Sequence, residues 1–210
     1  MAYRETEKMR QRKAQARQKI IESTWECVAD GGFQSARVTR IAGLAGVATG
    51  TIYRHFESRE DLFAEIFRLA TQREVDKVAE ALAITGNAVQ RLDHALRHFA
   101  QRALKGPMKA WALIAEPVDP KVEEERLAYR KAYANLFEKA IREGIEEGCI
   151  PDQDARQSST CLVGAIAESL VGPLSPTQTS QATSTTEDNN DPLVNSIICF
   201  CMQGLTGTRR

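Results

Sequence analysis

Hydrophobic residues recur at helical spacing along most of the chain, and no stretch alternates with the period of a strand. The N-terminal third predicts helices at about 15–30, 38–45 and 49–55. The remaining sequence predicts further helices, delimited by glycine and proline, at about 58–82, 87–105, 108–115, 120–147, 154–172 and 193–205. The pattern therefore predicts an all-α chain of about nine helices.

Two of the short helical patterns meet at Gly46. The first has apolar residues at 38, 41, 42 and 45, which form one helix face. Gly46 tolerates the positive φ of a tight turn, and Thr49 is expected to cap the second helix through its hydroxyl. The second helix buries only Ile52 and Phe56. This arrangement predicts a helix-turn-helix with residues 49–55 as the recognition helix.

Hydrogen-bond donors crowd the remaining face of this second helix, as contacts with base edges and phosphates require. A solvated surface helix is the competing interpretation, but it does not explain why the turn and the donors occur together. The predicted DNA-contacting residues are Arg37, Thr39, Arg40, Thr49, Gly50, Thr51, Tyr53, Arg54, His55 and Arg59.

The segment IAGLAGVATGTIYRHFESREDLF resembles the N-terminal signature of the TetR family of bacterial transcriptional regulators. The likeness spans about residues 15–67, and GVATGTIYRHF is its most specific part. The sequence departs from the family pattern in two ways. Ala36 and Arg37 stand where Thr or Ser is usual, and Arg40 stands where an acidic residue is common.

The resemblance implies a DNA-binding head at residues 15–67 and a body at 68–210 that dimerises and binds an effector. It also implies a homodimeric repressor with two partners, a palindromic double-stranded operator and a small organic effector. Effector binding would change the separation of the two heads by favouring one of two states.

Residues 1–14 have little apolar periodicity and are expected to form a flexible basic arm. Arg10, Arg12, Lys13 and the nearby Arg17 either are solvated or reach DNA phosphates, and both interpretations stay open. Residues 1–60 carry 11 Lys and Arg against 7 Asp and Glu, a net charge of +4, whereas the whole chain is neutral. A basic N-terminal part fits a protein that docks one end on a polyanion.

Other classes of protein find little support. No apolar run is long enough for a membrane span, and no signal peptide is visible, so a cytoplasmic protein without membrane contact is expected. His94 and His98 lie four residues apart, but no further ligand completes a metal site. We therefore expect no cofactor, no metal and no enzymatic activity. The alternative is a helical small-molecule-binding protein or enzyme that uses its helix-turn-helix for protein contact.

The body has aromatic and aliphatic helix faces that suggest a cavity for an organic ligand. A solid core is the competing interpretation, and periodicity does not separate the two. Trp25 is assigned to the core of the head by its spacing. The predicted cavity-lining residues are Phe99, Trp111, Tyr133, Phe137 and Leu162.

Helices 154–172 and 193–205 are apolar around most of their circumference, which favours a dimer interface over two central helices of a monomer. Residues 173–192 between them are rich in Pro, Ser and Thr and are expected to be a disordered loop. The predicted interface residues are Gly164, Ala167, Val171, Ile197, Ile198 and Cys201.

Overall fold

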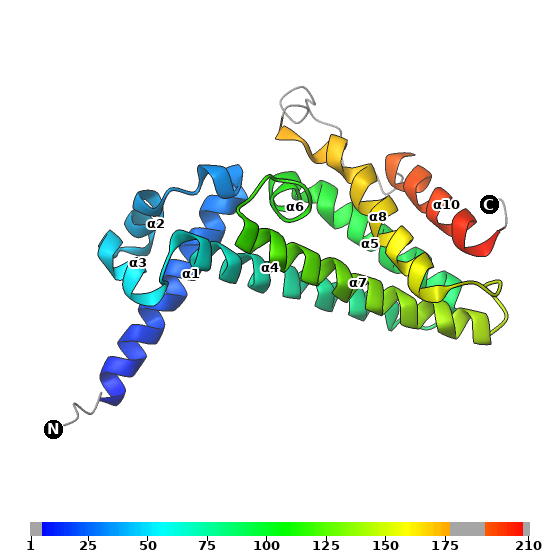
Figure 1. The fold of residues 1–210 in the computed structure, drawn as a ribbon, viewed down its shortest axis with the longest axis horizontal. Helices are drawn as coiled ribbons and strands as arrows, with labels where there is room; N and C mark the ends of the chain where they lie inside the picture. The colour runs from blue at the N-terminus through cyan, green and yellow to red at the C-terminus, as the bar shows by residue number, and fades with distance from the viewer. Residues whose placement is uncertain (1–5, 177–191, 208–210) are drawn as a thin grey trace.

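The structure is a computed structural model that describes residues 6–176 and 192–207. Within these ranges the chain is helical and contains no strand, so the all-α prediction is confirmed (Figure 1). The helices are α1 (Glu7–Ser35), α2 (Val38–Ala45), α3 (Thr49–His55), α4 (Arg59–Leu82), α5 (Ala88–Lys105), α6 (Pro107–Ile114), α7 (Pro120–Glu146), α8 (Ala155–Leu174) and α10 (Pro192–Thr206).

The molecule is elongated, with α1, α2 and α3 at one end and α8 and α10 toward the other (Figure 1). The long helices α4 and α7 run side by side between the two ends, and α5 packs with both of them. The short helix α6 packs on α1 and on α8, so it lies between the head and the body. Any signal between the two ends can therefore pass through α4, α6 or α7.

The head has a small core built around the turn between α2 and α3. Gly46 has φ 67° and ψ 34°, a left-handed conformation that glycine adopts without strain. The turn lets Ile41 and Ile52 face each other's helix, and both are at most 1% exposed. The Ser58 hydroxyl accepts a hydrogen bond from the Asp61 N–H at 3.0 Å and so caps the start of α4.

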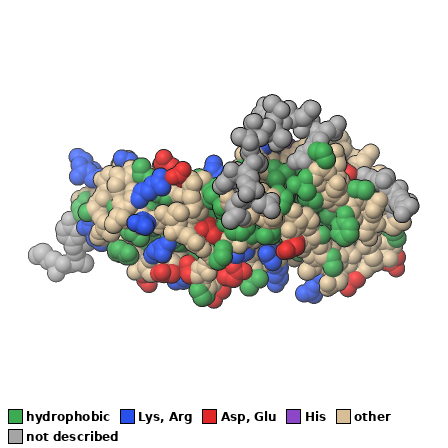
Figure 2. Space-filling view, turned by 90° about the horizontal axis from the view of Figure 1, so that it is seen from above, with side chains coloured by type: hydrophobic (Ala, Val, Ile, Leu, Met, Phe, Trp, Pro, Cys, Tyr) green, Lys and Arg blue, Asp and Glu red, His purple; other side chains and the backbone are tan. Residues whose placement is uncertain are grey.

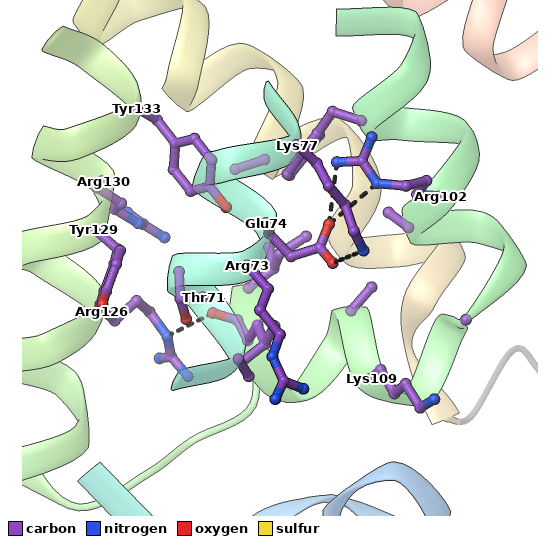
Figure 3. A pocket seen from close by; sticks show the side chains of 18 of the residues that line it. Thr71, Arg73, Glu74, Lys77, Arg102, Lys109, Arg126, Tyr129, Arg130 and Tyr133 are labelled. Carbon is purple, nitrogen blue, oxygen red and sulfur yellow. Dashed lines mark hydrogen bonds and ion pairs between the residues drawn. The ribbon is translucent and has the colours of Figure 1, made fainter. Parts of the chain in front are cut away.

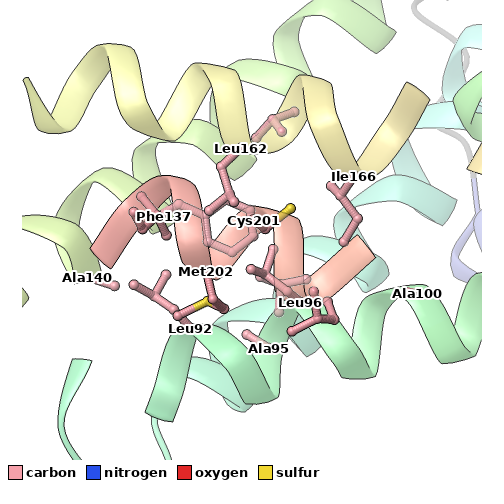
Figure 4. Packing of buried hydrophobic residues seen from close by; sticks show 14 of the residues in the cluster. Leu92, Ala95, Leu96, Ala100, Phe137, Ala140, Leu162, Ile166, Cys201 and Met202 are labelled. Atoms are coloured by element: carbon pink, nitrogen blue, oxygen red, sulfur yellow. The ribbon is translucent and has the colours of Figure 1, made fainter. Parts of the chain in front are cut away.

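The body has a larger core formed by α5, α7, α8 and α10 (Figure 4). Leu92 and Leu96 of α5 meet Phe137 of α7, Leu162 of α8 and Met202 of α10, and each of them is buried. Burial of side chains of this size contributes about 1.5–3 kcal/mol each. This core fixes the four helices against one another, and the C-terminal part of α4 packs into it through Val78, Ala81 and Leu82.

The prediction of a flexible arm over residues 1–14 is wrong for residues 7–14, because these belong to α1. Thr6 caps this helix, and Arg10 pairs with Glu7 at 2.6 Å. Once the buried middle of α1 is helical, each further residue extends the helix without the cost of nucleation. The basic residues are therefore presented on a helix. Residues 1–5 lie outside the described part.

Three further boundaries differ from the sequence prediction. Ala48, not Thr49, is the N-cap of α3, and no side chain caps that helix. Helix α8 continues through Pro173 to Leu174, because Leu174 is buried and a proline so near the end removes only one hydrogen bond. The loop expected at 173–192 therefore starts later, and its residues 177–191 lie outside the described ranges. None of the described helices has the length and apolar character needed to cross a membrane.

Candidate DNA-binding surface and ligand cavity

All ten residues predicted to contact DNA lie at least partly on the surface. Gly50, Tyr53 and Arg54 are exposed on α3, and Tyr53 keeps 48% of its surface accessible. Ile52, on the opposite side of the same helix, is buried in the head core. Helix α3 therefore separates a packed face from a face rich in hydrogen-bond donors, as a recognition helix requires.

Several arginines of this surface have partners within the protein. The Arg54 guanidinium donates to the Thr51 hydroxyl at 2.8 Å, so both side chains lie on one face of α3. Arg40 pairs with Asp30 of α1 at 2.7 Å. Arg59 donates to the Phe33 carbonyl at 3.2 Å. An arginine carries five N–H donors, so each of these side chains retains donors for a phosphate or a base.

His55 lies at the end of α3 near cationic side chains. Partial burial, together with the nearby Lys13, Arg17 and Arg54, lowers the pKa of His55 below its usual value. The imidazole is therefore neutral at pH 7. On this surface it offers one donor and one acceptor, and the arginines and lysines supply the charge.

Lys and Arg side chains gather over the end of the molecule that carries α2 and α3 (Figure 2). Hydrophobic side chains are more frequent over the other half, toward α8 and α10. This distribution agrees with the charge asymmetry of the sequence. The basic end is therefore the surface suited to a polyanion.

A cavity of about 420 Å³ lies in the body, within the usual size range of small-molecule sites. Its lining comes from α4, α5, α6, α7 and α8, with contributions from α1. Of the predicted lining residues, Phe99, Tyr133 and Phe137 do reach it. Trp111 and Leu162 do not. Trp111 is packed against the body core, and Leu162 is buried in that core.

Trp25 lines the cavity as well as packing against the head core, so its assignment to the core alone is wrong. It is only partly buried. Helical spacing places Trp25 on the inner face of α1, but it does not show that this part of the face meets an open cavity rather than another side chain.

The polar lining of the cavity divides into paired and unpaired charges. Glu74 receives ion pairs from Lys77 at 2.8 Å and Arg102 at 3.1 Å (Figure 3). The Tyr133 ring points into the same space, and burial raises the pKa of its hydroxyl, which therefore stays protonated. Four further cations of the lining form no ion pair with any described residue. These are Arg73, Lys105, Lys109 and Arg130.

Sequence analysis did not select these four cations, because each lies on a helix face that reads as solvent-exposed. They come from α4, α5, α6 and α7, so only the fold brings them to one opening. Apolar lining residues, among them Phe67, Ile114 and Ile166, form the rest of the wall. The arrangement suits an amphiphile with an apolar chain and an anionic head.

Three of the predicted interface residues are not accessible for a contact between subunits. Ile197, Ile198 and Cys201 are buried inside the chain, where α10 packs against α5 and α8. Gly164 is exposed, and Ala167 and Val171 are half-buried on α8. Ala167 also lines the cavity. An apolar sequence shows that α10 is covered on several sides but not which side faces its own chain.

Two family models match the chain. "Bacterial regulatory proteins, tetR family" matches residues 20–66, and "Tetracyclin repressor-like, C-terminal domain" matches residues 85–181. The chain belongs to the TetR family. It is a DNA-binding transcriptional regulator, and the resemblance noted in the sequence is confirmed.

Named relatives cover most of the chain. The fatty acid metabolism regulator protein of Bacillus subtilis is 27% identical over 160 residues, which span 72% of this chain and 79% of that protein. The repressor KstR2 of Mycobacterium tuberculosis is 25% identical over 146 residues, which span 66% of this chain and 71% of that protein.

Among solved structures, FadR from Bacillus subtilis in complex with stearoyl-CoA superposes with a TM-score of 0.72 at 23% identity. The superposition covers 90% of this chain and 98% of FadR. FadR from Bacillus halodurans gives a TM-score of 0.70 at 22% identity, again over 90% of this chain and 98% of that one. At such identities the likeness shows the fold.

Proposed function

We propose that the chain is a homodimeric, cytoplasmic repressor without enzymatic activity, and that a long-chain acyl-CoA thioester releases it from its operator. Residues up to 67 would bind DNA, and the remainder would dimerise and hold the effector. The observation that carries the effector class is the cavity, which combines an apolar wall with four cations that have no carboxylate partner among the described residues.

The apolar part of the proposal follows from the wall itself. Aromatic and aliphatic side chains of α4, α7 and α8, such as Phe67, Phe137 and Ile166, surround the space. Such a wall favours a hydrocarbon chain, which gains free energy by leaving water. The solved FadR that this fold resembles holds stearoyl-CoA, a molecule of this class.

The anionic part follows from the charges. Lys77 and Arg102 share the one carboxylate of Glu74, whereas Arg73, Lys105, Lys109 and Arg130 form no ion pair with any described residue. Four cations exceed the need of a single carboxylate and suit several phosphate charges. Charge-assisted hydrogen bonds from lysine and arginine to phosphate are stronger than neutral ones. A coenzyme A head carries such phosphates, and a free fatty acid does not.

Operator binding would use two copies of α3. Two heads related by a two-fold axis reach successive major grooves when they lie about 34–36 Å apart. An effector that binds more tightly to a different head separation would shift the population away from DNA. In the DNA-bound state, the exposed donors of α3 and the basic start of α1 would contact each half-site.

The effector proposal is tested with palmitoyl-CoA, palmitate and coenzyme A as separate probes. Because Trp25 lines the cavity, palmitoyl-CoA should change tryptophan fluorescence at micromolar concentration. It should also lower the affinity for an operator selected from random duplexes by at least tenfold. Arg130→Gln should weaken palmitoyl-CoA binding by roughly tenfold, about the 1.5 kcal/mol of one charged hydrogen bond.

Arg142→Gln is the matched control, because Arg142 lies on α7 like Arg130 but pairs with Glu138 away from the cavity. It should bind palmitoyl-CoA as the unaltered protein does. Equal binding of palmitate and palmitoyl-CoA would contradict the role of the phosphates. Binding of palmitoyl-CoA without any change in operator affinity would contradict the role as effector.

The basic start of α1 gives a separate prediction about DNA. Arg12 and Lys13 are exposed and form no ion pair with a described residue, unlike Arg10. Arg12→Gln with Lys13→Gln should weaken operator binding and flatten its salt dependence by up to about two units of slope, one for each phosphate contact. Glutamine preserves the helix. An unchanged slope in filter-binding titrations over 50–200 mM salt would show that these side chains are only solvated.

A further inference from the structure

The junction between α1 and α2, residues 31–37, is held from two sides. Gly31 and Gly32 interrupt the helical conformation, and the Phe33 carbonyl accepts a hydrogen bond from Arg59 at the start of α4. On the other side, the Phe33 and Gln34 N–H groups donate to the two carboxylate oxygens of Glu116 at 2.8 and 2.9 Å. The segment that leads into the helix-turn-helix is thus attached to the body.

Glu116 follows the C-terminal end of α6 and is only 3% exposed. A buried carboxylate is tolerated when its oxygens accept hydrogen bonds, and here each oxygen has one N–H donor. Gly32 makes room for this contact. A Cβ at position 32 would lie 2.5 Å from a Glu116 oxygen, and its φ of 76° is unfavourable for other residues. The missing side chain of Gly32 and its positive φ therefore both allow the Glu116 carboxylate to reach the junction.

Arg126 of α7 holds the same end of α6 from the side of the cavity. Its guanidinium donates to the carbonyls of Glu116 at 2.7 Å and Leu113 at 3.2 Å, and it pairs with Glu123 at 2.5 Å. Arg126 is only 7% exposed, yet it lines the cavity (Figure 3). A contact between a ligand and Arg126 would therefore act directly on the backbone that carries Glu116.

Helix α6 occupies the space between these two sets of contacts. Lys109, Leu113 and Ile114 line the cavity, while Glu116, just beyond the helix, binds the junction. Because the α6 region contacts both the cavity and the junction, a displacement of α6 at the cavity also moves Glu116 at the junction. An occupant that moves α6 or draws the Arg126 guanidinium toward itself would move the Glu116 carboxylate relative to the two N–H groups.

We propose that Glu116 and Arg126 are positioning residues that transmit occupancy of the cavity to the DNA-binding helices, through the hydrogen bonds of Glu116 to Phe33 and Gln34. With the cavity empty, these bonds hold α2 and α3 in the arrangement that binds the operator. An anionic or carbonyl group of the occupant competes with the α6 carbonyls for Arg126, and the Glu116 contacts are lost. The identity of the occupant rests on the proposed function, whereas the link itself does not.

The link is tested first without ligand, in the full-length protein. Glu116→Gln keeps the shape but leaves one oxygen for two N–H donors. Hydrogen–deuterium exchange followed by NMR should show the Phe33 or Gln34 amide exchanging at least tenfold faster than in the unaltered protein. Operator affinity should fall by about tenfold. Arg126→Met should accelerate the same two amides although residue 126 touches neither, and Arg126→Lys serves if the methionine variant does not fold.

Arg142→Met is the matched control, because Arg142 also lies on α7 but pairs with Glu138 and does not line the cavity. It should leave both amides and the ligand-free operator affinity unchanged. Unaltered exchange of both amides in Glu116→Gln would overturn the proposal. So would acceleration in Glu116→Gln that neither Arg126 variant reproduces.

Palmitoyl-CoA then tests regulation. In the unaltered protein it should lower operator affinity at least tenfold, and in Glu116→Gln less than twofold. Glu116→Gln should bind palmitoyl-CoA at least as tightly as the unaltered protein, because coupling between the two sites is reciprocal. An undiminished response of Glu116→Gln would overturn the link. If the unaltered protein does not bind palmitoyl-CoA, the proposed effector is wrong, and the ligand-free exchange data still decide whether the link exists.

Discussion

Arg54→Ala should weaken operator binding by roughly tenfold to a hundredfold, the equivalent of about 1–3 kcal/mol for an arginine that contacts a guanine. The guanidinium is exposed on α3, and its hydrogen bond to Thr51 fixes its direction along the outer face of the helix. Because neither side chain belongs to the core, the substitution should change the free energy of unfolding by no more than about 0.5 kcal/mol.

The measurement is a titration of selected operator DNA and of an unrelated duplex at one salt concentration. A contact with a base edge should cost affinity for the operator alone, whereas a phosphate contact should weaken both duplexes alike. Arg142→Ala removes the same charge from the far side of the body and should have little effect. Tyr53→Ala tests the neighbouring side chain. If both Arg54→Ala and Tyr53→Ala bind the operator normally, α3 is not the recognition helix.

Local signals in the sequence predicted several helix boundaries well. Gly46 marks a turn because it alone avoids strain at positive φ, and Ser58 and Asn87 mark helix starts because their side chains cap backbone N–H groups within three residues. Each signal concerns residues close in sequence. Prediction failed at Thr49 because Ala48 occupies the cap position, and helix α3 starts there without a side-chain partner.

Contacts between distant segments were not predictable in the same way. Glu116 reads as the end of a short helix before a proline, and nothing near it indicates a bond to Phe33, 83 positions away. Arg73 and Arg130 read as solvent-facing residues of two separate helices until the fold brings both to the cavity. Periodicity gives the face of a helix, but the partner of that face depends on tertiary packing.

For the apolar C-terminal helices, too, the sequence did not show which face is buried in the chain. The structure shows which residues of α8 and α10 are exposed. Ile198 is buried in its own chain, whereas Phe200 of α10 is 69% exposed. Helix α8 packs beside α10 and exposes Cys161 and Gly164. An exposed aromatic side chain on one helix, and exposed small residues on the helix that packs beside it, fit a helix–helix contact between subunits. We expect these faces to pair about a two-fold axis.

Phe200→Glu should therefore convert a dimer into a monomer, because pairing would bury a carboxylate beside its symmetry mate. Loss of the second head should weaken operator binding by roughly 10²–10⁴-fold, since avidity of that size depends on two linked contacts. Gly164→Glu should act in the same direction. A Cβ at position 164 meets no atom within 4 Å in its own chain, so the fold should survive the change.

Sedimentation at micromolar concentration measures the first effect, and operator protection measures the second. The unaltered chain should sediment with about twice its monomer mass of 23.3 kDa. Leu127→Glu is the control for Phe200→Glu, because Leu127 is also an exposed apolar side chain, 58% accessible, but lies on α7. It should remain dimeric and bind DNA. An unaltered chain that sediments as a monomer while protecting a two-fold-symmetric operator would show that α8 and α10 do not form the interface.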